Sequence, residues 1–369
     1  MNTRTALIIF SVVFSLGLFA IVLLPFLLGK GPVSPKTERP EEAQAIADQG
    51  VFRSTDGGRT WDQKSAVAEG GSIASFKVNR LMPDPADPAT LWLATDGSGL
   101  FVSRDRGDLW QRVADETGLF ETTSNVLAIA VHPQNREEWY AAVFQKNRGR
   151  VLRTADGGRT FREIYFTPLE RFGVFDLHYD RTRGTILIAT GQGGLIESAD
   201  RGLTWRVVRW FADGLLEILV NPVSPQMRFA VSSRGKIFRS RDFGETWADA
   251  SSSLREFPGA EENQRWVIDR LGNLWLGSRH GLLRSSDDAE TLDAPPLIIP
   301  PEALPVLAIA VHPGNPSRIA VSADSQLYQS ENGGETWAIL PSPAPLGKRV
   351  THLMFDPEQQ ETLYAVVQP

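Results

Sequence analysis

The sequence predicts an all-β fold: a seven-bladed β-propeller that is closed by its C-terminal strands pairing with its N-terminal strand and is preceded by one transmembrane helix. Three observations predict this. A turn motif recurs seven times at intervals of 42–51 residues, which is the period of propeller blades. The same short apolar runs, cut by Gly and Pro, recur between the motifs. An uncharged apolar run covers residues 6–28.

The turn motif has the form Ser-x-Asp-x-Gly-x-Thr-Trp and is complete in STDGGRTW at residues 54–61. Its Asp side chain can accept hydrogen bonds from its own turn, and its Gly takes a positive φ without strain. A calcium loop needs several oxygen ligands at fixed spacing, whereas each of these turns offers one carboxylate, so we predict a structural role and no metal. The sixth copy has Ala289 for Gly and Leu292 for the aromatic residue, so we expect the least well-held turn there. The Asp-equivalent positions are Asp56, Asp105, Asp156, Asp200, Asp242, Asp287 and Asn332.

The runs between the motifs predict four strands for each blade. VLAIAVHP at 126–133 is typical of an innermost strand, and EWYAAVF at 138–144 of the second. Only one run, GVFRS at 50–54, precedes the first motif. Its two missing inner strands are predicted at the end of the chain, at 350–355 and 362–367. The C-terminus therefore completes the first blade, which leaves no open sheet edge.

The N-terminal region predicts a membrane anchor. Residues 1–5 form a short tail, 6–28 a transmembrane signal-anchor helix, 29–49 a flexible linker and 50–369 the propeller. The apolar run reaches the roughly 20 residues that a bilayer needs. A cleaved signal peptide is the alternative, although its apolar region typically has about 7–15 residues. Because such short N-terminal tails usually stay inside, we expect a single-pass protein of the cell membrane, with the propeller on the extracytoplasmic (periplasmic or extracellular) side.

Composition excludes several kinds of function. The chain has no cysteine, so it forms no disulfide, zinc-thiolate site or cysteine nucleophile. Its net charge of -6 gives no electrostatic footprint for nucleic acid. No phosphate loop, zinc-protease helix or nucleophile elbow is present. We therefore expect no cofactor.

The repeated motif resembles the BNR/Asp-box repeats of sialidases, sortilin-type receptors, xyloglucanase-type glycosidases and the photosystem II assembly/stability factor, over residues 50–369. In size and blade number the chain is most similar to the photosystem II assembly/stability factor family. That resemblance implies a single ring outside the cytoplasm with a non-catalytic assembly or scaffold role. The sialidase Arg-Ile-Pro signature and the Cys-rich module of sortilin-type receptors are missing, and xyloglucanase-type enzymes pair two propellers. No binding residue of these families is transferred to this chain.

One face of the predicted ring is rich in basic residues. It is built from the turns between second and third strands and from the loops between blades, opposite the Asp boxes. The candidate partner-binding residues are Lys146, Arg148, Arg150, Arg234, Lys236, Arg279, His280, Arg80, Arg265, Arg349, Trp210, Phe211 and Phe257. They form either a docking site for an acidic or C-terminal segment of a partner, or solvated loop charge with aromatic residues that cap the blades. His132 and His312 occupy equivalent turns about four blades apart, which favours a turn role over a metal site.

These features together predict a membrane-anchored, non-enzymatic protein-interaction scaffold that assists a membrane complex. We expect a monomer whose partner is a membrane protein or its soluble segment. The alternative is a carbohydrate-active or glycan-binding propeller. A cleft with paired carboxylates and exposed aromatic residues would favour the alternative, whereas arginines at the channel mouth would favour the scaffold.

Overall fold

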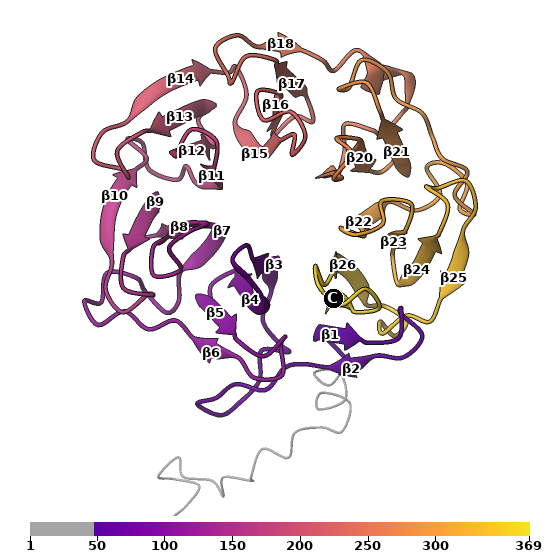
Figure 1. The fold of residues 1–369 in the computed structure, drawn as a ribbon, viewed down its shortest axis with the longest axis horizontal. Coiled ribbons are helices and arrows are strands. Elements are labelled where there is room, and N and C mark those ends of the chain that lie inside the picture. Colours follow the sequence, from indigo (N-terminus) through magenta and orange to yellow (C-terminus); the bar gives the residue numbers. More distant parts are fainter. Residues whose placement is uncertain (1–47) are drawn as a thin grey trace, which may run out of the picture. The chain divides into compact units, whose positions relative to one another are not determined.

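The computed structural model describes residues 48–369, which form seven antiparallel sheets arranged as blades around a central channel (Figure 1). The described residues form one compact unit. The predicted tail and transmembrane helix, and all of the predicted linker except residues 48 and 49, lie outside the described residues. Within residues 48–369, no helix is long and apolar enough to cross a membrane.

In each blade the strand named first lines the channel and the strand named last lies at the outer edge. Blade 1 contains β26 (Arg349–Phe355), β27 (Leu363–Gln368), β1 (Gly50–Ser54) and β2 (Asp62–Gln63). Blade 2 contains β3 (Val78–Asp84), β4 (Asp87–Thr95), β5 (Leu100–Ser103) and β6 (Gln111–Arg112). Blade 3 contains β7 (Asn125–Val131), β8 (Trp139–Gln145), β9 (Arg148–Thr154) and β10 (Arg162–Phe166). Blade 4 contains β11 (Val174–Asp180), β12 (Thr185–Thr190), β13 (Gly194–Ser198) and β14 (Arg206–Trp210).

The remaining blades follow in chain order. Blade 5 contains β15 (Leu215–Val220), β16 (Arg228–Ser232), β17 (Ile237–Ser240) and β18 (Ala248–Asp249). A short 3₁₀ helix, η1 (Ser253–Glu256), precedes blade 6. Blade 6 has three strands, β19 (Arg265–Ile268), β20 (Leu274–Gly277) and β21 (Leu282–Ser285). Blade 7 contains β22 (Val306–Val311), β23 (Ile319–Ala323), β24 (Gln326–Ser330) and β25 (Ala338–Leu340).

The ring closes as the sequence predicts. β1 pairs with β27 in antiparallel register from Gly50 opposite Val367 to Ser54 opposite Leu363, and β26 pairs with the other edge of β27. The two ends of the propeller thus share one blade (Figure 1). Val51, Leu363 and Val367 are fully buried, so the closure removes apolar side chains and strand edges from water.

The Asp boxes are hydrogen-bonded turns. In the first box the Ser54 hydroxyl accepts the Gly58 N–H at 2.8 Å, and the Asp56 carboxylate accepts the Thr60 N–H at 2.9 Å and the Thr60 hydroxyl at 2.6 Å. The threonine hydroxyl is the largest of the effects that lower the aspartate pKa. It lowers the pKa of Asp200 and Asp242 to about 2, because donated hydrogen bonds favour the ionised form. In the first box the serine and the aspartate thus hold their own turn through hydrogen bonds.

The box turns also define the two faces of the ring. Box backbone groups bond to the turn between the first and second strands of the same blade, as in Gly57 N–H to Glu361 C=O at 2.8 Å and Gly157 N–H to Glu137 C=O at 2.9 Å. We call this side the Asp-box face. The turns between second and third strands, together with the loops between blades, lie at the other end of the strands, which we call the loop face. Gln49 lies on the loop face, where its side chain accepts a hydrogen bond from Lys348 at 3.3 Å.

Blade 6 departs from the sequence prediction. Its degenerate turn keeps its bonds, since Ser285 Oγ accepts the Ala289 N–H at 2.9 Å and Asp287 Oδ1 accepts the Thr291 N–H at 2.9 Å. Ala289 takes the left-handed conformation with φ of 64° in place of the usual glycine. The expectation that this turn is poorly held was therefore wrong. The irregularity of blade 6 lies instead after the turn, where its fourth strand is missing.

A proline explains the missing fourth strand. In blade 2 the Val113 N–H donates to the Leu100 carbonyl of the third strand at 2.9 Å. The equivalent position in blade 6, two residues after the Arg284–Asp293 bridge, is Pro295. Proline has no N–H to donate, so pairing stops after Asp293. An apolar cavity of about 140 Å³ lies beside β21 and is lined by Leu282, Pro295 and their neighbours.

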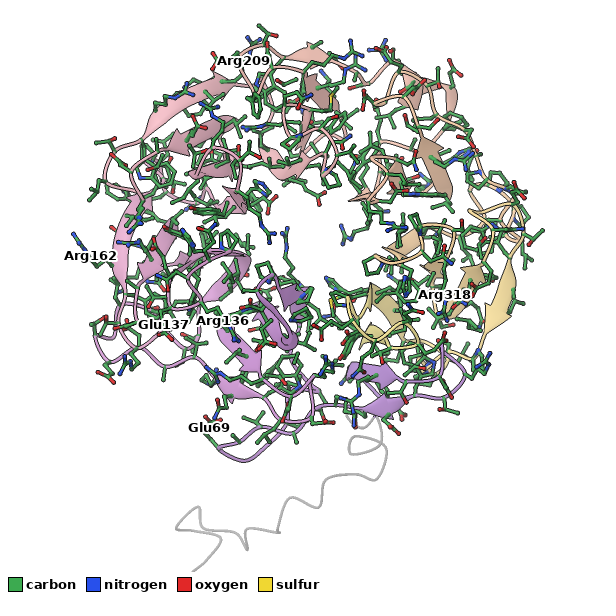
Figure 2. All side chains as sticks on the ribbon, in the orientation of Figure 1. Glu69, Arg136, Glu137, Arg162, Arg209 and Arg318 are labelled. Carbon is green, nitrogen blue, oxygen red and sulfur yellow. The ribbon has the colours of Figure 1, made fainter. Side chains whose placement is uncertain are left out.

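Arginines link every pair of neighbouring blades near the Asp-box face. Six of these links are ion pairs and the seventh is a hydrogen bond to a backbone carbonyl. They join Arg106 to Asp356, Arg136 to Asp87, Arg201 to Glu138, Arg228 to Asp180, Arg239 to Glu290, Arg284 to the Gly333 carbonyl, and Arg318 to Glu361. Arg162 and Arg209 on the outer strands instead point away from the ring (Figure 2). Many of the arginines therefore hold blades together.

Candidate functional site

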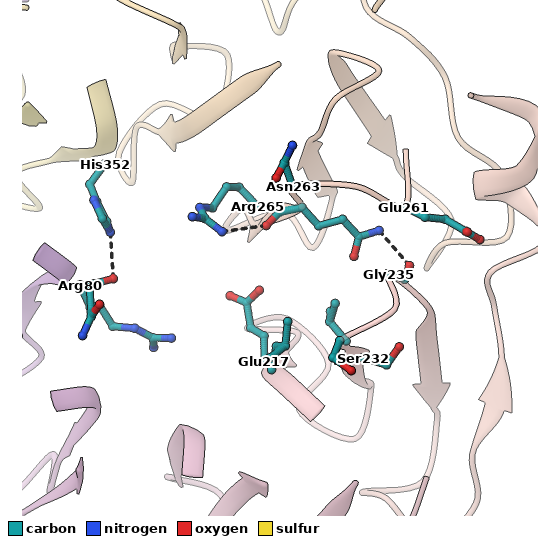
Figure 3. A pocket seen from close by; sticks show the side chains of 13 residues that line it. Arg80, Glu217, Ser232, Gly235, Glu261, Asn263, Arg265 and His352 are labelled. Carbon is teal, nitrogen blue, oxygen red and sulfur yellow. Dashed lines mark hydrogen bonds between the residues drawn. The ribbon is translucent and has the colours of Figure 1, made fainter. Parts of the chain in front are cut away.

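The candidate site is a cavity of about 410 Å³ at the mouth of the channel on the loop face. Arg80, Glu217, Arg265 and His352 come from the inner strands of four blades and surround it (Figure 3). The rim adds the loops around Ser232 and around Glu261–Gln264 of blades 5 and 6. The lining residues are Asn79, Arg80, Leu216, Glu217, Val231, Ser232, Ser233, Gly235, Glu261, Asn263, Gln264, Arg265 and His352.

A β-bulge aims the inner-strand side chains at the channel. Six inner strands skip one residue in their pairing with the second strand, as between Val78 and Arg80 or between Leu215 and Glu217. A bulge bends a strand and redirects the side chain beside it. The residue that follows the bulge is Arg80, Asp176, Glu217 or His352 in blades 2, 4, 5 and 1, but Ala128 and Ala308 in blades 3 and 7. The bulge thus repeats in six blades, while a charged side chain follows it only in blades 2, 4 and 5 of the described propeller.

Arg80 and Asp176 form an ion pair across the channel. The Arg80 Nη1 lies 3.0 Å from Asp176 Oδ1, and the second oxygen of Asp176 accepts the Ile218 N–H at 2.9 Å. Asp176 is 3% exposed, so these two partners compensate for a carboxylate that burial would otherwise penalise. The pair raises the pKa of Arg80 above its usual value.

Glu217 and Arg265 face the same cavity but are not joined to each other. Among the described residues no ion pair includes either one, and the Arg265 guanidinium donates only to the Gln264 carbonyl at 3.1 Å. Burial, with the nearby Asp176 charge as the second cause, raises the pKa of Glu217 to about 7. The site therefore contains one satisfied charge pair, one cation that lacks a carboxylate and one carboxyl group that lacks a hydrogen-bond partner.

His352 is neutral in this site near pH 7. Its Nε2 lies 2.9 Å from the Asn79 carbonyl, and that contact requires a proton on Nε2. Burial lowers the pKa of His352 to about 4, because the imidazolium loses solvation. The ring orders the wall of the cavity without adding charge.

The other predicted basic residues are paired on the loop face. Each one that carries a fixed charge meets a nearby carboxylate. The pairs are Lys146 with Glu121 (3.1 Å), Arg148 with Glu170 (3.5 Å), Arg150 with Glu163, Arg234 and Lys236 with Asp213 (3.1 and 4.0 Å), Arg279 with Glu262 (3.1 Å), and Arg349 with Asp324 (3.4 Å). Of the two alternatives left by the sequence, a docking patch or solvated loop charge, neither is decided by these contacts, but most of the charges are neutralised locally by a carboxylate. Arg80 and Arg265 are the predicted residues that the structure brings to one cavity.

The predicted aromatic anchors have different environments. Trp210 is 52% exposed at the end of β14, whereas Phe211 is 9% exposed, is tilted against Phe238 and lies edge-on to Trp247. Phe257 packs against the core and lies edge-on to His280, whose Nδ1 is 3.0 Å from the Pro258 carbonyl. Phe211, Phe257 and His280 are parts of the packing, which leaves Trp210 as an exposed aromatic side chain.

The histidines of the equivalent turns are turn residues, as predicted. The His312 Nδ1 accepts N–H groups of Gly314 and Asn315 at 3.0 and 2.9 Å. The His132 Nδ1 accepts the Gln134 N–H at 3.2 Å. Residues 48–369 contain no cluster of three or more His, Cys, Asp or Glu side chains that is arranged to hold a metal ion.

Comparisons with known proteins agree with this architecture. Residues 49–164 match the family model for sortilin, neurotensin receptor 3. The chain is a seven-bladed propeller of Asp-box repeats. It is 25% identical over 290 residues to the oligoxyloglucan-reducing end-specific xyloglucanase of Emericella nidulans, a match that covers 69% of this chain and 33% of the enzyme. The chain thus spans about a third of the length of the curated relatives it matches.

Two solved structures show the same fold. The GH74 xyloglucanase of Xanthomonas campestris superposes with a TM-score of 0.64 at 19% identity, over 79% of this chain and 51% of the enzyme. YCF48 bound to D1 peptide superposes with a TM-score of 0.61 at 18% identity, over 80% of this chain and 93% of that protein. Identities this low carry the fold and leave the activity open.

Proposed function

We propose that this protein is a non-enzymatic docking module whose loop face binds an acidic or C-terminal segment of a partner protein at the channel mouth. The observation that carries the proposal is Arg265, a guanidinium without a carboxylate partner beside a cavity of about 410 Å³. A guanidinium presents planar N–H donors that match a carboxylate. Arg80, held by Asp176 at 3.0 Å, adds a second, fixed cation on the opposite wall.

The single-ring relative supports this direction. YCF48 is covered over 93% of its length by the match, and its solved complex contains a peptide. A single ring with a peptide is therefore a precedent within this fold at the same size. A peptide segment also suits a cavity whose rim is built from loops of two blades, because loop atoms can pair with an extended backbone.

A carbohydrate-active or glycan-binding role is the second candidate, favoured by 25% identity to a xyloglucanase. The cavity argues against it. A glycosidase needs two carboxyl groups roughly 5–9.5 Å apart at the sugar, and Glu217 and Glu261 line the cavity, so it is the remaining lining residues that disfavour a sugar site. None of the residues that line the cavity is Trp, Tyr or Phe, so no aromatic ring is available to stack on a sugar.

We further propose that the partner belongs to a membrane complex and that the propeller lies on the extracytoplasmic side of the membrane. The motivation is the uncharged run at residues 6–28, which has the length of a membrane span. The described chain begins on the loop face, next to Lys348.

Affinity capture tests the proposal. The full-length protein is captured from its native membranes as wild type, as Arg265→Glu and as the control Arg162→Glu, in which an outward-pointing arginine of β10 is changed (Figure 2). We expect one partner to be retained by wild type and the control and lost by Arg265→Glu. Equal capture by all three variants, together with hydrolysis of xyloglucan oligosaccharides by the purified protein, would reverse the order of the two candidates.

A further inference from the structure

We infer that docking at the channel mouth is coupled to uptake of one proton by Glu217, so that a carboxylate-bearing segment binds more tightly on the acidic side of neutrality. This inference rests on the proposed function, because it concerns how the same cavity accepts its ligand. It adds a regulatory property that peptide docking alone does not require.

The geometry of the cavity identifies Glu217 as the group that changes. Its carboxyl group projects into the space between Arg80 and Arg265 (Figure 3). Asp176 is fixed by the Ile218 N–H and by Arg80, whereas no described residue is hydrogen-bonded to the Glu217 carboxyl group. An incoming carboxylate that reaches Arg265 must therefore enter next to an unpaired carboxyl group.

The charges around Glu217 give the direction of the effect. Arg80 on β3 and Arg265 on β19 face it as cations, and Asp176 on β11 faces it as an anion. If Glu217 is ionised, the two positive and two negative charges of this cluster cancel. If Glu217 is protonated, the cluster carries one net positive charge and its carboxyl O–H is a donor. Only the protonated state offers an anion both net attraction and an additional hydrogen bond.

The two histidines nearest the cavity are shifted toward the neutral form. The pKa of His352 on β26 is lowered to about 4 by burial, and burial also lowers the pKa of His178 on β11. The His352 imidazole is therefore neutral between pH 6 and 8, and the shift of His178 favours its neutral form as well. The pKa of Glu217, raised to about 7 by burial, lies within that interval. Glu261 also lines the cavity, but on its outer loop, which makes it a matched control.

Linkage gives the size of the effect. If only the protonated site binds, the protonated fraction sets the apparent affinity, and that fraction falls about tenfold between pH 6 and pH 8 for a pKa of about 7. Aspartate and C-terminal carboxyl groups of a peptide have pKa values of about 4 or lower. They are therefore ionised throughout the interval from pH 6 to pH 8, and the ligand itself does not titrate there.

Fluorescence polarisation tests the inference with a defined probe, a fluorescein-labelled octapeptide of alternating alanine and aspartate that ends in a free carboxylate. We expect wild type to bind it about tenfold more tightly at pH 6 than at pH 8. Glu217→Gln, a permanent analogue of the protonated state, should bind at both pH values with the wild-type pH 6 affinity. Glu261→Gln should keep the pH dependence of wild type. Thermal melting of each variant verifies that it is folded.

The outcomes separate the two claims. Binding by wild type that is equal at pH 6 and pH 8, or a pH dependence that persists in Glu217→Gln, would overturn the proton coupling and leave peptide docking intact. No binding by wild type at either pH, with Arg265→Glu indistinguishable from it, would remove the docking site and the coupling together. Calorimetry in two buffers of different ionisation enthalpy should also report uptake of about one proton near pH 8 in wild type.

Discussion

The ion pair between Arg228 and Asp180 should be the most costly of the blade links to break. Arg228 on β16 and Asp180 at the end of β11 join blades 5 and 4, and both side chains are 2% exposed. Asp180 also accepts the backbone N–H groups of Thr182 and Arg183 at 2.9 and 3.1 Å, and the Arg228 guanidinium lies 5.3 Å from the centre of the Phe243 ring. Burial lowers the pKa of Arg228, and the Asp180 charge opposes that effect.

Replacing Arg228 with methionine keeps most of the volume but leaves the Asp180 carboxylate buried without its cation. Removing one member of a buried pair typically costs about 3–5 kcal/mol. The matched control is Arg136→Met at the interface of blades 2 and 3. There the two side chains are 49% and 33% exposed, and a surface pair contributes about 0–1 kcal/mol.

Urea unfolding, followed by tryptophan fluorescence and analysed with a common slope, measures both losses. The double variant Arg228→Met with Asp180→Asn should recover part of the loss, since no uncompensated charge remains. Equal losses for the Arg228 and Arg136 variants would refute the assignment of the buried pair as the dominant link. A double variant that is no more stable than Arg228→Met would refute the electrostatic reason.

Three further predictions follow from the structure. Deleting residues 363–369 removes β27 from blade 1 and exposes the edges of β1 and β26. Size-exclusion chromatography of this variant should therefore show aggregates. A soluble monomer that unfolds cooperatively would contradict ring closure. Changing Thr204 to Val removes the hydroxyl that donates to Asp200 at 2.6 Å. The pKa of Asp200, measured by carbon-13 NMR titration, should then rise from about 2 toward 3.8. An unchanged pKa would contradict the role of the hydroxyl. Glu217 has a folded-state pKa raised from 4.5 to about 7, so its contribution to stability is complete below pH 4.5 and is lost as the pH rises through 7. Wild type should therefore lose about 1–3 kcal/mol between pH 5 and pH 8 relative to Glu217→Gln, and parallel curves from chemical unfolding would contradict this.

The fold was predictable because its determinants are local and repeated. The Ser-x-Asp-x-Gly motif carries its own hydrogen bonds, and the motif count gives the blade count. The closure by β1 and β27 followed from one missing pair of strands at one end and one surplus pair at the other. The sequence also contains the cause of the missing fourth strand of blade 6, which is Pro295. The turn residues Ala289 and Leu292 do not report it, because the determinant is the absent N–H of Pro295, three residues beyond the turn.

The candidate site was only partly predictable. Arg80 and Arg265 were assigned to the channel mouth, but the acidic partners of the loop arginines lie in other loops or blades, and no local pattern reports such pairs. Asp176, Glu217 and His352 were missed, although a signal existed. Aligning the inner strands of the repeats places charged or imidazole side chains where blades 3 and 7 have Ala128 and Ala308. The transmembrane helix at residues 6–28 stays a prediction.

Hydrogen exchange of the propeller with and without the alanine–aspartate octapeptide at pH 6 tests the docking site most directly. The loop-face account predicts slower exchange in two segments at the cavity rim, the turn at 232–236 and the loop at 259–265. It predicts no change in the Asp-box turns, such as residues 54–61, at the other end of the strands. Protection confined to the Asp-box turns or the outer strands, with the rim unchanged, would contradict docking at the channel mouth.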